Sequence, residues 1–566
     1  MRHFICQPLR EVAFIFFVVL TGVAMAIPIN RTPFTHTQTD GTTIVVYPYG
    51  DESYHYFTND QGEQLVRNEA GDFVACGNKE GIAPIEGDSP YRNYRPYRRE
   101  REEKRQPRRA RQIFGRDAFL APKGLVILVE FADKKFQSSN PPTAIDSLMN
   151  GTDYHYDGAT GSVRQYFTDQ SLGQYTPHFE VVGPVTLPHP YKYYGANDAQ
   201  GLDSNLADFV IDACLAADSL ADFSEIDFDN DGYVDFVYLL YAGYGEADKH
   251  EEDLIWPCNW DLDITIEEGY STQTTYTAEH LPQLDGKYIN SYACSNCLKP
   301  DGKRAGIGSV CHEYSHVIGL PDLYDVYFGS NYDNYLTPGK WHIMDQGAYN
   351  NGGKTPPSFS PWDKYFLGWA TPTLLATSSN DTLPADGKTY RYMVADGTSQ
   401  EASSEQKVYY LENRQKTGWD AYTPGHGMLV WRVQYDFIIW AVNEPNASES
   451  KEYGKPMANV HGNVNYTLIP AAGDLRSQSA SLNAQSSTPF PGNMNVHSCN
   501  ILEAYPLTDI EENDGVITYR VKGGETTAIT TTTTGTTTET MKLIQNGQLV
   551  IIRNGKEYNA QGGRRD

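Results

Sequence analysis

The stretch CHEYSHVIGLPDLYD, residues 311–325, places two histidines four positions apart around a glutamate. Residues i and i+4 of an α-helix share one face, so His312 and His316 can both direct an imidazole at one metal ion. Glu313 then lies beside the open coordination position, where a carboxylate can accept a proton from an activated water. The stretch therefore predicts a helix with a catalytic zinc site, rather than a buried structural pair of histidines.

The residues after this helix indicate the third ligand. Gly319 is expected to end the helix, because glycine adopts the left-handed conformation that other residues resist, and the chain then turns back toward the metal. No glutamate occurs between His316 and Glu401, so a glutamate ligand from a downstream helix would lie very far away. We therefore predict Asp322 as the third zinc ligand, with Asp325 as the alternative.

A methionine follows in the turn-rich segment WHIMDQGAYN, residues 341–350. Met344 is typical of the Met-turn, a hydrophobic base beneath the zinc ligands of metzincins. A methionine in a turn is often only a core residue, but its distance after the zinc helix favours the Met-turn.

These motifs, with LIWPCNW (254–260) and YYLENRQKTGWDAYTPGHGMLVWRV (409–433), resemble the immune inhibitor A family of secreted bacterial metallopeptidases over about residues 120–520. The resemblance implies a metzincin-like catalytic domain with zinc held by His312, His316 and Asp322, and with Glu313 as the base. It also favours bound calcium. One departure is Arg432, where the family leads us to expect a histidine; the catalytic assignment does not depend on it.

A second metal site is predicted at DFDNDGYVD, residues 227–235. Carboxylates at positions 1, 3, 5 and 9, with glycine at position 6, match the first part of an EF-hand loop. Position 12 is Tyr238 rather than glutamate, so we expect a shortened calcium loop, with a solvated acidic turn as the alternative. Carboxylates packed together without a cation repel one another, which favours calcium. The predicted ligands are Asp227, Asp229, Asp231, Asp235 and the carbonyl of Tyr233.

The N-terminus predicts export. Arg2, His3 and Arg10 precede an apolar run, residues 12–23, and the small residues AMA at 24–26. This pattern indicates a signal peptide, residues 1–26, and the run is too short for a transmembrane helix. No second segment is long and apolar enough to span a membrane. We therefore expect a secreted protein, extracellular or on the cell surface.

Composition shifts divide the rest of the chain. Residues 27–115 are predicted to be a prosegment: a small β-meander followed by a linker in which residues 92–116 carry eleven Arg or Lys against three Glu. An exposed basic linker is a favoured site of proteolysis, here of maturation. We expect an α+β fold: a metzincin-like catalytic domain with a twisted mixed sheet (116–370), then a β-sandwich-like module (371–524). A Thr-rich linker and a short hairpin tail complete the chain (525–566).

The net charge of −27 in 566 residues excludes a nucleic-acid binder, because phosphate neutralisation needs a basic face. We predict a secreted zinc endopeptidase that cleaves proteins or peptides and is made as a latent precursor, inhibited by its own prosegment. Cys76, a prosegment aspartate or simple steric cover could block the zinc. The alternative is a non-catalytic surface adhesin with a structural zinc and a glycan- or protein-binding β-module. Glu313 distinguishes the two, because a structural site needs no carboxylate beside an open coordination position.

Overall fold

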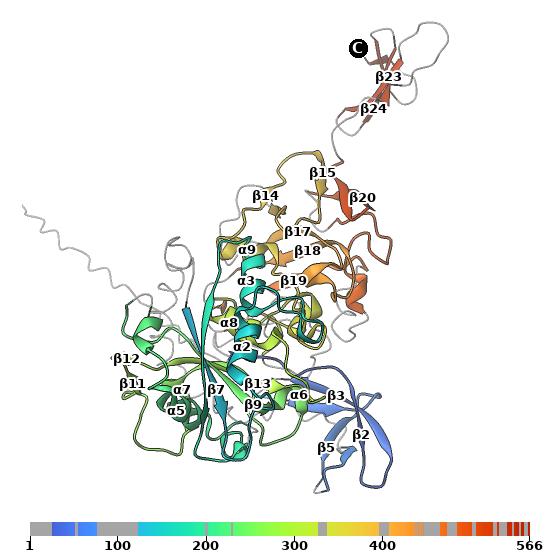
Figure 1. Cartoon of the computed structure of the whole chain (residues 1–566). Helices are drawn as coiled ribbons and strands as arrows, with labels where there is room; N and C mark the ends of the chain where they lie inside the picture. The colour runs from blue at the N-terminus through green and yellow to red at the C-terminus, as the bar shows by residue number, and fades with distance from the viewer. Residues whose placement is uncertain are drawn as a thin grey trace, which may run out of the picture.

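The computed structural model describes residues 25–50, 55–68, 70–75, 123–198, 202–227, 230–326, 337–394, 407–435, 439–440, 443, 445–446, 465–472, 484–500 and 505–523, and in the tail 529–530, 540–545, 548–553, 556–559 and 564–565. Residues 1–24 of the predicted signal peptide, Cys76, the Arg-rich linker, Asp229 and Tyr327 lie outside these ranges. Figure 1 shows the arrangement of the elements.

A six-stranded mixed sheet forms the centre of the predicted catalytic domain, in the order β1-β10-β13-β9-β7-β8. Its four parallel strands are β7 (Lys123–Glu130), β8 (His178–Thr186), β9 (Val237–Tyr244) and β13 (Ser291–Leu298). The apolar runs 124–133 and 233–243 predict β7 and β9, and both strands are almost entirely buried, as parallel strands between covering layers are. Two strands extend the sheet antiparallel: β10 (Cys258–Asp261), and β1 (Met25–Ala26) at the edge.

Helices pack against this sheet. The longest are α5 (Leu206–Ala217), α2 (Pro141–Asn150), α8 (Gly308–Val317) and α3 (Val163–Gln170). Helix α3 begins after Ser162, whose hydroxyl accepts a hydrogen bond from the Gln165 N–H at 3.1 Å, as an N-cap serine does. The short helices are α4 (Tyr191–Tyr194), α6 (Glu246–Lys249), α7 (Leu262–Glu267) and α9 (Pro361–Phe366).

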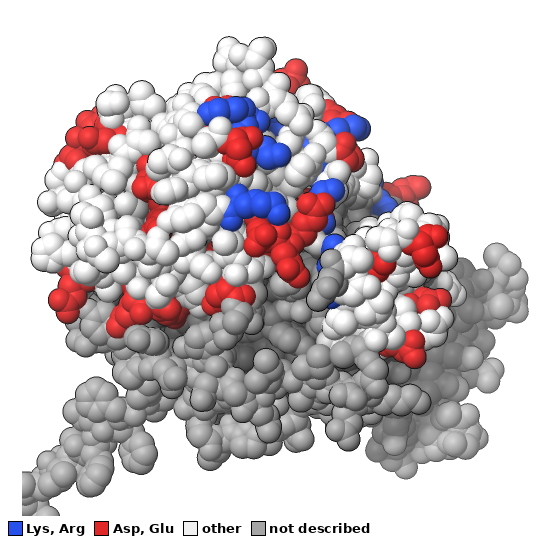
Figure 2. Space-filling model, turned by 90° about the horizontal axis from the view of Figure 1, so that it is seen from below, with Lys and Arg blue, Asp and Glu red and all other residues white. Residues whose placement is uncertain are grey.

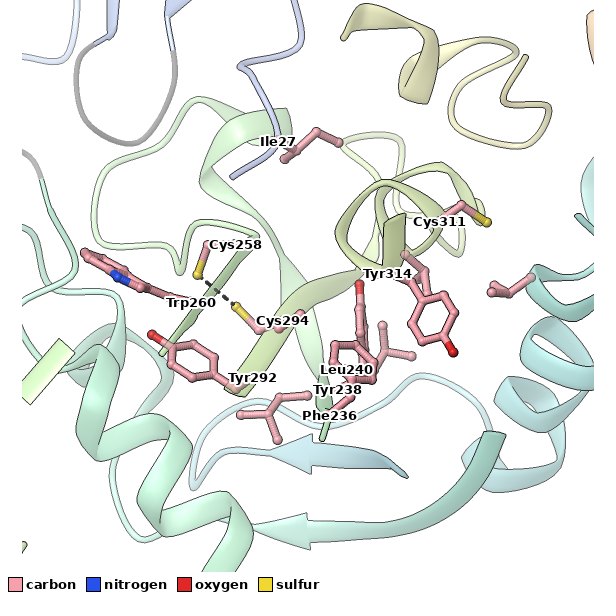
Figure 3. Packing of buried hydrophobic residues seen from close by; sticks show 14 of the residues in the cluster. Ile27, Phe236, Tyr238, Leu240, Cys258, Trp260, Tyr292, Cys294, Cys311 and Tyr314 are labelled. Atoms are coloured by element: carbon pink, nitrogen blue, oxygen red, sulfur yellow. Dashed lines mark hydrogen bonds between the residues drawn. The ribbon is translucent and has the colours of Figure 1, made fainter. Parts of the chain in front are cut away.

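The main core surrounds the central sheet, and the part between the sheet and α8 is rich in aromatic side chains (Figure 3). Phe236 and Tyr238 project from the start of β9 toward Tyr314 of α8, and the Tyr314 hydroxyl lies 2.7 Å from that of Tyr175. A buried phenol needs a polar partner, and here the two hydroxyl groups are partners of each other. The thiols of Cys258 and Cys294 lie 3.8 Å apart on paired strands. The core thus holds α8 rigidly against the sheet.

The C-terminal part forms two antiparallel-dominated sheets. One joins β14 (Thr373–Leu374), β16 (Arg391–Val394), β17 (Val408–Arg414), β18 (Gly427–Val433) and β19 (Tyr466–Leu468). The other joins β15 (Ser379–Leu383), β21 (Val516–Val521) and β20 (Leu507–Asn513). A second apolar cluster contains buried side chains from both sheets. The two sheets therefore share a core of their own.

Smaller sheets lie at the two ends of the described chain. The N-terminal one is an antiparallel meander, as its turn signals predict, and the tail has its own antiparallel sheet around the β23-β24 hairpin (Figure 1). The meander strands are β2 (Phe34–Thr37), β3 (Thr43–Gly50), β4 (His55–Thr58), β5 (Gln64–Arg67) and β6 (Phe73–Ala75). The tail strands are β22 (Ile529–Thr530), β23 (Thr540–Gln545), β24 (Gln548–Arg553), β25 (Lys556–Asn559) and β26 (Arg564–Arg565). A pair of short strands, β11 (Gln283–Leu284) and β12 (Lys287–Tyr288), lies near the predicted calcium loop.

The described chain is thus a mixed α+β protein with several sheets, as expected. None of its described helices is long and apolar enough to cross a bilayer. On the face shown in Figure 2, acidic side chains are spread widely, whereas Lys and Arg gather in one region among acidic neighbours. The described residues of this face form no continuous basic track of the kind that binds nucleic acid.

Candidate active site

The helix α8 carries the histidine pair in the interior of the molecule. Its start fits tightly: the Gly308 N–H donates to the carbonyl of Gly353 at 2.7 Å, and a Cβ on Gly308 would lie 1.9 Å from the Ala348 carbonyl oxygen. Only glycine tolerates this approach. Gly319 then reverses the chain with φ of 100°, and its N–H donates to the His316 carbonyl at 2.9 Å, as its sequence position predicts.

Both imidazoles are oriented by backbone carbonyls. The Nδ1 atom of His312 lies 2.8 Å from the carbonyl oxygen of Ile343, and that of His316 lies 2.8 Å from the carbonyl oxygen of Leu320. Each Nδ1 therefore carries the proton and donates it, which leaves each Nε2 with a lone pair. This is the tautomer that a metal-binding histidine needs.

Asp322 meets these two nitrogens from the turn after the helix. Its Oδ1 atom lies 3.1 Å from Nε2 of His312 and 3.4 Å from Nε2 of His316, and all three side chains are buried. None of the three atoms has a hydrogen-bond partner among the described residues. Buried polar atoms without partners are rare, and three that converge fit a metal ion between them.

The charges of the three residues suit a cation. Burial alone would raise the pKa of Asp322, but the two histidines hold the pKa of this carboxyl well below its usual range. Burial also lowers the pKa of His316, despite the opposing carboxylate. A carboxylate beside neutral imidazoles is the protonation state in which such residues bind zinc.

Glu313 is fully buried beside this cluster, and its nearest oxygen lies within 4.8 Å of the ligand atoms of both histidines. Burial raises the pKa of Glu313 well above its ordinary value, and the Asp322 carboxylate raises it further. The backbone N–H of Ile27 acts in the opposite direction. A glutamate with a raised pKa beside a metal is suited to hold a proton and release it again.

The segment around Met344 contacts the turn that carries Asp322. Met344 is fully buried, and its carbonyl oxygen accepts the N–H of Leu323 at 2.8 Å. The neighbouring His342 is also buried, with Nε2 2.5 Å from Oδ2 of Asp363 at the start of α9. The segment that carries Met344 thus supports both the His312 ring, through Ile343, and the turn that carries Asp322.

The N-terminal segment passes directly over Glu313. Strand β1 is the edge strand of the sheet and pairs with β10, and Ile27, the next residue after β1, is completely buried (Figure 3). The carbonyl of Ile27 accepts a hydrogen bond from the indole N–H of Trp256 at 3.1 Å, and that of Pro28 accepts one from the Tyr349 hydroxyl at 2.7 Å. The Gln346 amide donates to the Ile29 carbonyl at 3.2 Å. The segment therefore lies in the site as an extended peptide, held through its carbonyls.

The predicted calcium loop is less complete in the structure. The Asp227 carboxylate accepts the N–H groups of Asp231 and Gly232, both at 3.1 Å, and Nζ of Lys287 lies 2.6 Å from its Oδ2. The N–H of Tyr233 donates to Asp231 at 2.9 Å, and that of Asp235 donates to the Ile226 carbonyl at 2.8 Å. Because Asp229 lies outside the described residues, the calcium site stays a prediction.

Two residues of this site have no signal in the motifs. Trp256 contacts the N-terminal segment, and Asn443 hydrogen-bonds to Asp322. Trp256 lies within a stretch that carries the family resemblance, but nothing in its spacing indicates a role. Asn443 lies 121 positions after Asp322, and no local pattern relates the two.

Two histidines and a buried glutamate on one helix, with a buried carboxylate in the turn that follows, are the arrangement typical of metallopeptidases. The family model of the immune inhibitor A peptidase M6 catalytic domain matches residues 118–371. The resemblance to the immune inhibitor A family of metallopeptidases is therefore confirmed over this segment.

Two relatives show the same likeness. The chain is 30% identical over 283 residues to "Immune inhibitor A" of Bacillus thuringiensis subsp. alesti, a match covering 43% of this chain and 39% of the relative. It is 27% identical over 243 residues to "Pre-pro-metalloprotease PrtV" of Vibrio cholerae serotype O1, covering 38% of this chain and 25% of the relative. The match thus spans less than half of each relative.

Proposed function

We propose that this chain is a secreted zinc endopeptidase that hydrolyses peptide bonds of proteins. The observation that carries the proposal is the convergence of His312 Nε2, His316 Nε2 and Asp322 Oδ1, all buried and without hydrogen-bond partners among the described residues. Zinc bound there supplies a Lewis acid that polarises the scissile carbonyl and lowers the pKa of water.

The residues of the chain would do the proton chemistry. Glu313 is positioned to take a proton from the attacking water and to give it later to the leaving amine. Its raised pKa favours the protonated form once the proton has arrived. Burial of the cluster excludes bulk water, which strengthens the electrostatic interactions inside. With bulk water excluded from the site, Glu313 would therefore serve as both base and acid.

We propose that a tyrosine stabilises the oxyanion, and three tyrosines that follow the zinc motif in the sequence are candidates: Tyr324, Tyr327 and Tyr349. Tyr349 is favoured, because its hydroxyl already donates to a peptide carbonyl, that of Pro28, in the segment over Glu313. Tyr324 is buried, and Tyr327 lies outside the described residues. We propose Tyr349 as the group that would bind the carbonyl of a substrate.

Latency would arise from the N-terminal segment. The contacts of Ile27, Pro28 and Ile29 favour cover of the site by these residues over blockage by Cys76, which lies outside the described residues. Maturation would cut within residues 98–116 and allow the segment to leave. We also propose that the catalytic domain is metzincin-like, with a Met-turn at Met344, and that the C-terminal module is sandwich-like. The calcium loop is part of the same proposal.

The test is digestion of a generic protein substrate such as casein by chain trimmed with trypsin. Trimmed wild type should digest casein and lose the activity when a zinc chelator is added. Glu313→Ala should bind one zinc ion and fold normally, yet digest no casein after the same trimming. Casein digestion by trimmed Glu313→Ala near the wild-type rate would overturn the mechanism and reopen the alternative of an adhesin with a structural zinc.

A further inference from the structure

Asn443 forms a two-point clamp on the third metal-binding side chain. Its Oδ1 atom accepts the backbone N–H of Asp322 at 2.6 Å, and its Nδ2 group donates to Oδ2 of the same residue at 2.7 Å. Both residues are at most 1% exposed. Because Oδ2 is engaged by the amide, only Oδ1 of Asp322 faces the two histidines.

A second asparagine, Asn446, connects the same turn to the C-terminal sheets. The side-chain amide of Asn446 donates to the carbonyls of Leu323 and of Tyr466, both at 2.7 Å, and its Oδ1 accepts the Tyr466 N–H at 2.9 Å. Tyr466 is the first residue of β19, in the five-stranded sheet. Strand β19 and the turn after the zinc helix are thus joined through one buried asparagine.

Asn443 also has the backbone conformation that its role requires. Its φ is 60°, in the left-handed region that asparagine occupies more readily than most residues. In this conformation its side chain hydrogen-bonds to Asp322, while the carbonyl of Met344 accepts the N–H of Leu323. The turn at residues 322–323 is therefore held both by a residue within the matched segment 118–371 and by a residue beyond it.

We infer that Asn443 is a positioning residue for the metal site, and that the C-terminal part of the chain completes this site. The inference rests on the proposed zinc function. A side chain that orients a metal ligand typically contributes a factor of about 10–100 to metal affinity. Residues 118–371, which the family model matches, would then lack Asn443, a residue that the zinc site within them uses.

The experiment measures zinc affinity of the full chain by competition with a chromophoric chelator, so the readout does not depend on catalysis. Asn443→Gly removes the clamp without straining the left-handed backbone, and we expect a loss of about 10–100-fold in affinity. Asn443→Asp keeps the size and the acceptor for the Asp322 N–H but faces Oδ2 with a carboxylate oxygen, so its affinity should also fall at least about tenfold. This second variant covers the case in which Asn443→Gly fails to fold.

Asn413→Ala is the matched control. Asn413 is also buried in the C-terminal part, and its amide donates to two carbonyls, of Leu383 and Gly515, both at 2.8 Å. Asn413→Ala should lower the melting temperature of the zinc-free protein as much as Asn443→Gly, yet keep wild-type zinc affinity. Zinc affinity of both Asn443 variants within twofold of wild type, or an equal loss in Asn413→Ala, would overturn the inference. If wild type itself binds no zinc, the proposed function fails instead.

Discussion

The hydroxyl of Tyr349 donates a hydrogen bond to the carbonyl oxygen of Pro28, 2.7 Å away and 321 positions earlier in the chain. Tyr349 lies in the same segment as Met344, residues 341–350, and Pro28 follows the residue that covers Glu313. A group that binds a peptide carbonyl in the covered site is suited to bind the carbonyl of a substrate once the site is open. One hydroxyl would then serve both latency and catalysis.

This relationship predicts two opposite effects of Tyr349→Phe. The trimmed variant should lose about 100–1000-fold in kcat on casein, because a donor to the developing oxyanion is removed. The untrimmed variant should be activated faster by trypsin, because the N-terminal segment loses a hydrogen bond. Tyr422→Phe, at an exposed tyrosine, is the control and should match wild type in both assays. A wild-type kcat in trimmed Tyr349→Phe would exclude the catalytic role.

The choice between two buried aspartates can be decided by metal content. Asp322→Ala should lose zinc, because Oδ1 of Asp322 is the oxygen that meets both histidines. Asp325→Ala should retain zinc, although this residue is equally buried. Metal analysis of both purified variants gives the answer directly. Zinc retained by the first variant and lost by the second would move the third ligand to Asp325.

The predicted calcium loop should stabilise the start of β9. Calcium bound only by the native state raises stability by mass action, by about 2.7 kcal/mol at a concentration 100 times its Kd. Added calcium should therefore raise the melting temperature of wild type, and Asp229→Ala should abolish the rise. Asp60→Ala, at an exposed position of the meander, should respond as wild type does. An equal rise in Asp229→Ala would argue against the site and leave Asp227 paired with Lys287 alone.

Glu246 predicts a pH dependence of stability. Burial raises the pKa of Glu246 to about 9, and the nearby Asp203 raises it further. The folded protein therefore keeps a proton that the unfolded chain releases above its ordinary pKa of 4.5. Stability from this group is full below about pH 4 and is lost as the pH rises toward 9.

Glu246→Gln cannot ionise, so its melting temperature should fall less between pH 5 and pH 9 than that of wild type. At pH 9 the variant should melt higher by on the order of 3 °C. Thermal unfolding at several pH values, with the exposed Glu279→Gln as control, provides the measurement. Parallel curves for wild type and Glu246→Gln would show that the carboxylate is ionised in the folded protein.

The sequence by itself determines the local parts of this protein. The i, i+4 geometry of a helix brings His312 and His316 to one face whatever the rest of the chain does, and Gly319 turns the chain because it lacks a Cβ. Continuous apolar runs likewise predict β7 and β9, since strands covered on both sides need them. These features depend on a few neighbouring residues, so a reader of the sequence can find them.

Only the tertiary structure decides which distant residues contact helix α8 and the turn after it. Asn443 reaches Asp322 across 121 positions, and the Trp256 indole reaches the carbonyl of Ile27 across 229. Each contact depends on how distant strands are paired and how the sheets pack, and no periodicity of the sequence records that. A hydrogen bond needs its two atoms within about 3 Å, a condition that folding meets and spacing along the chain does not. The predicted ligands can therefore be found from a motif, whereas the residues that hydrogen-bond to them and the segment that covers the site are known only from the folded chain.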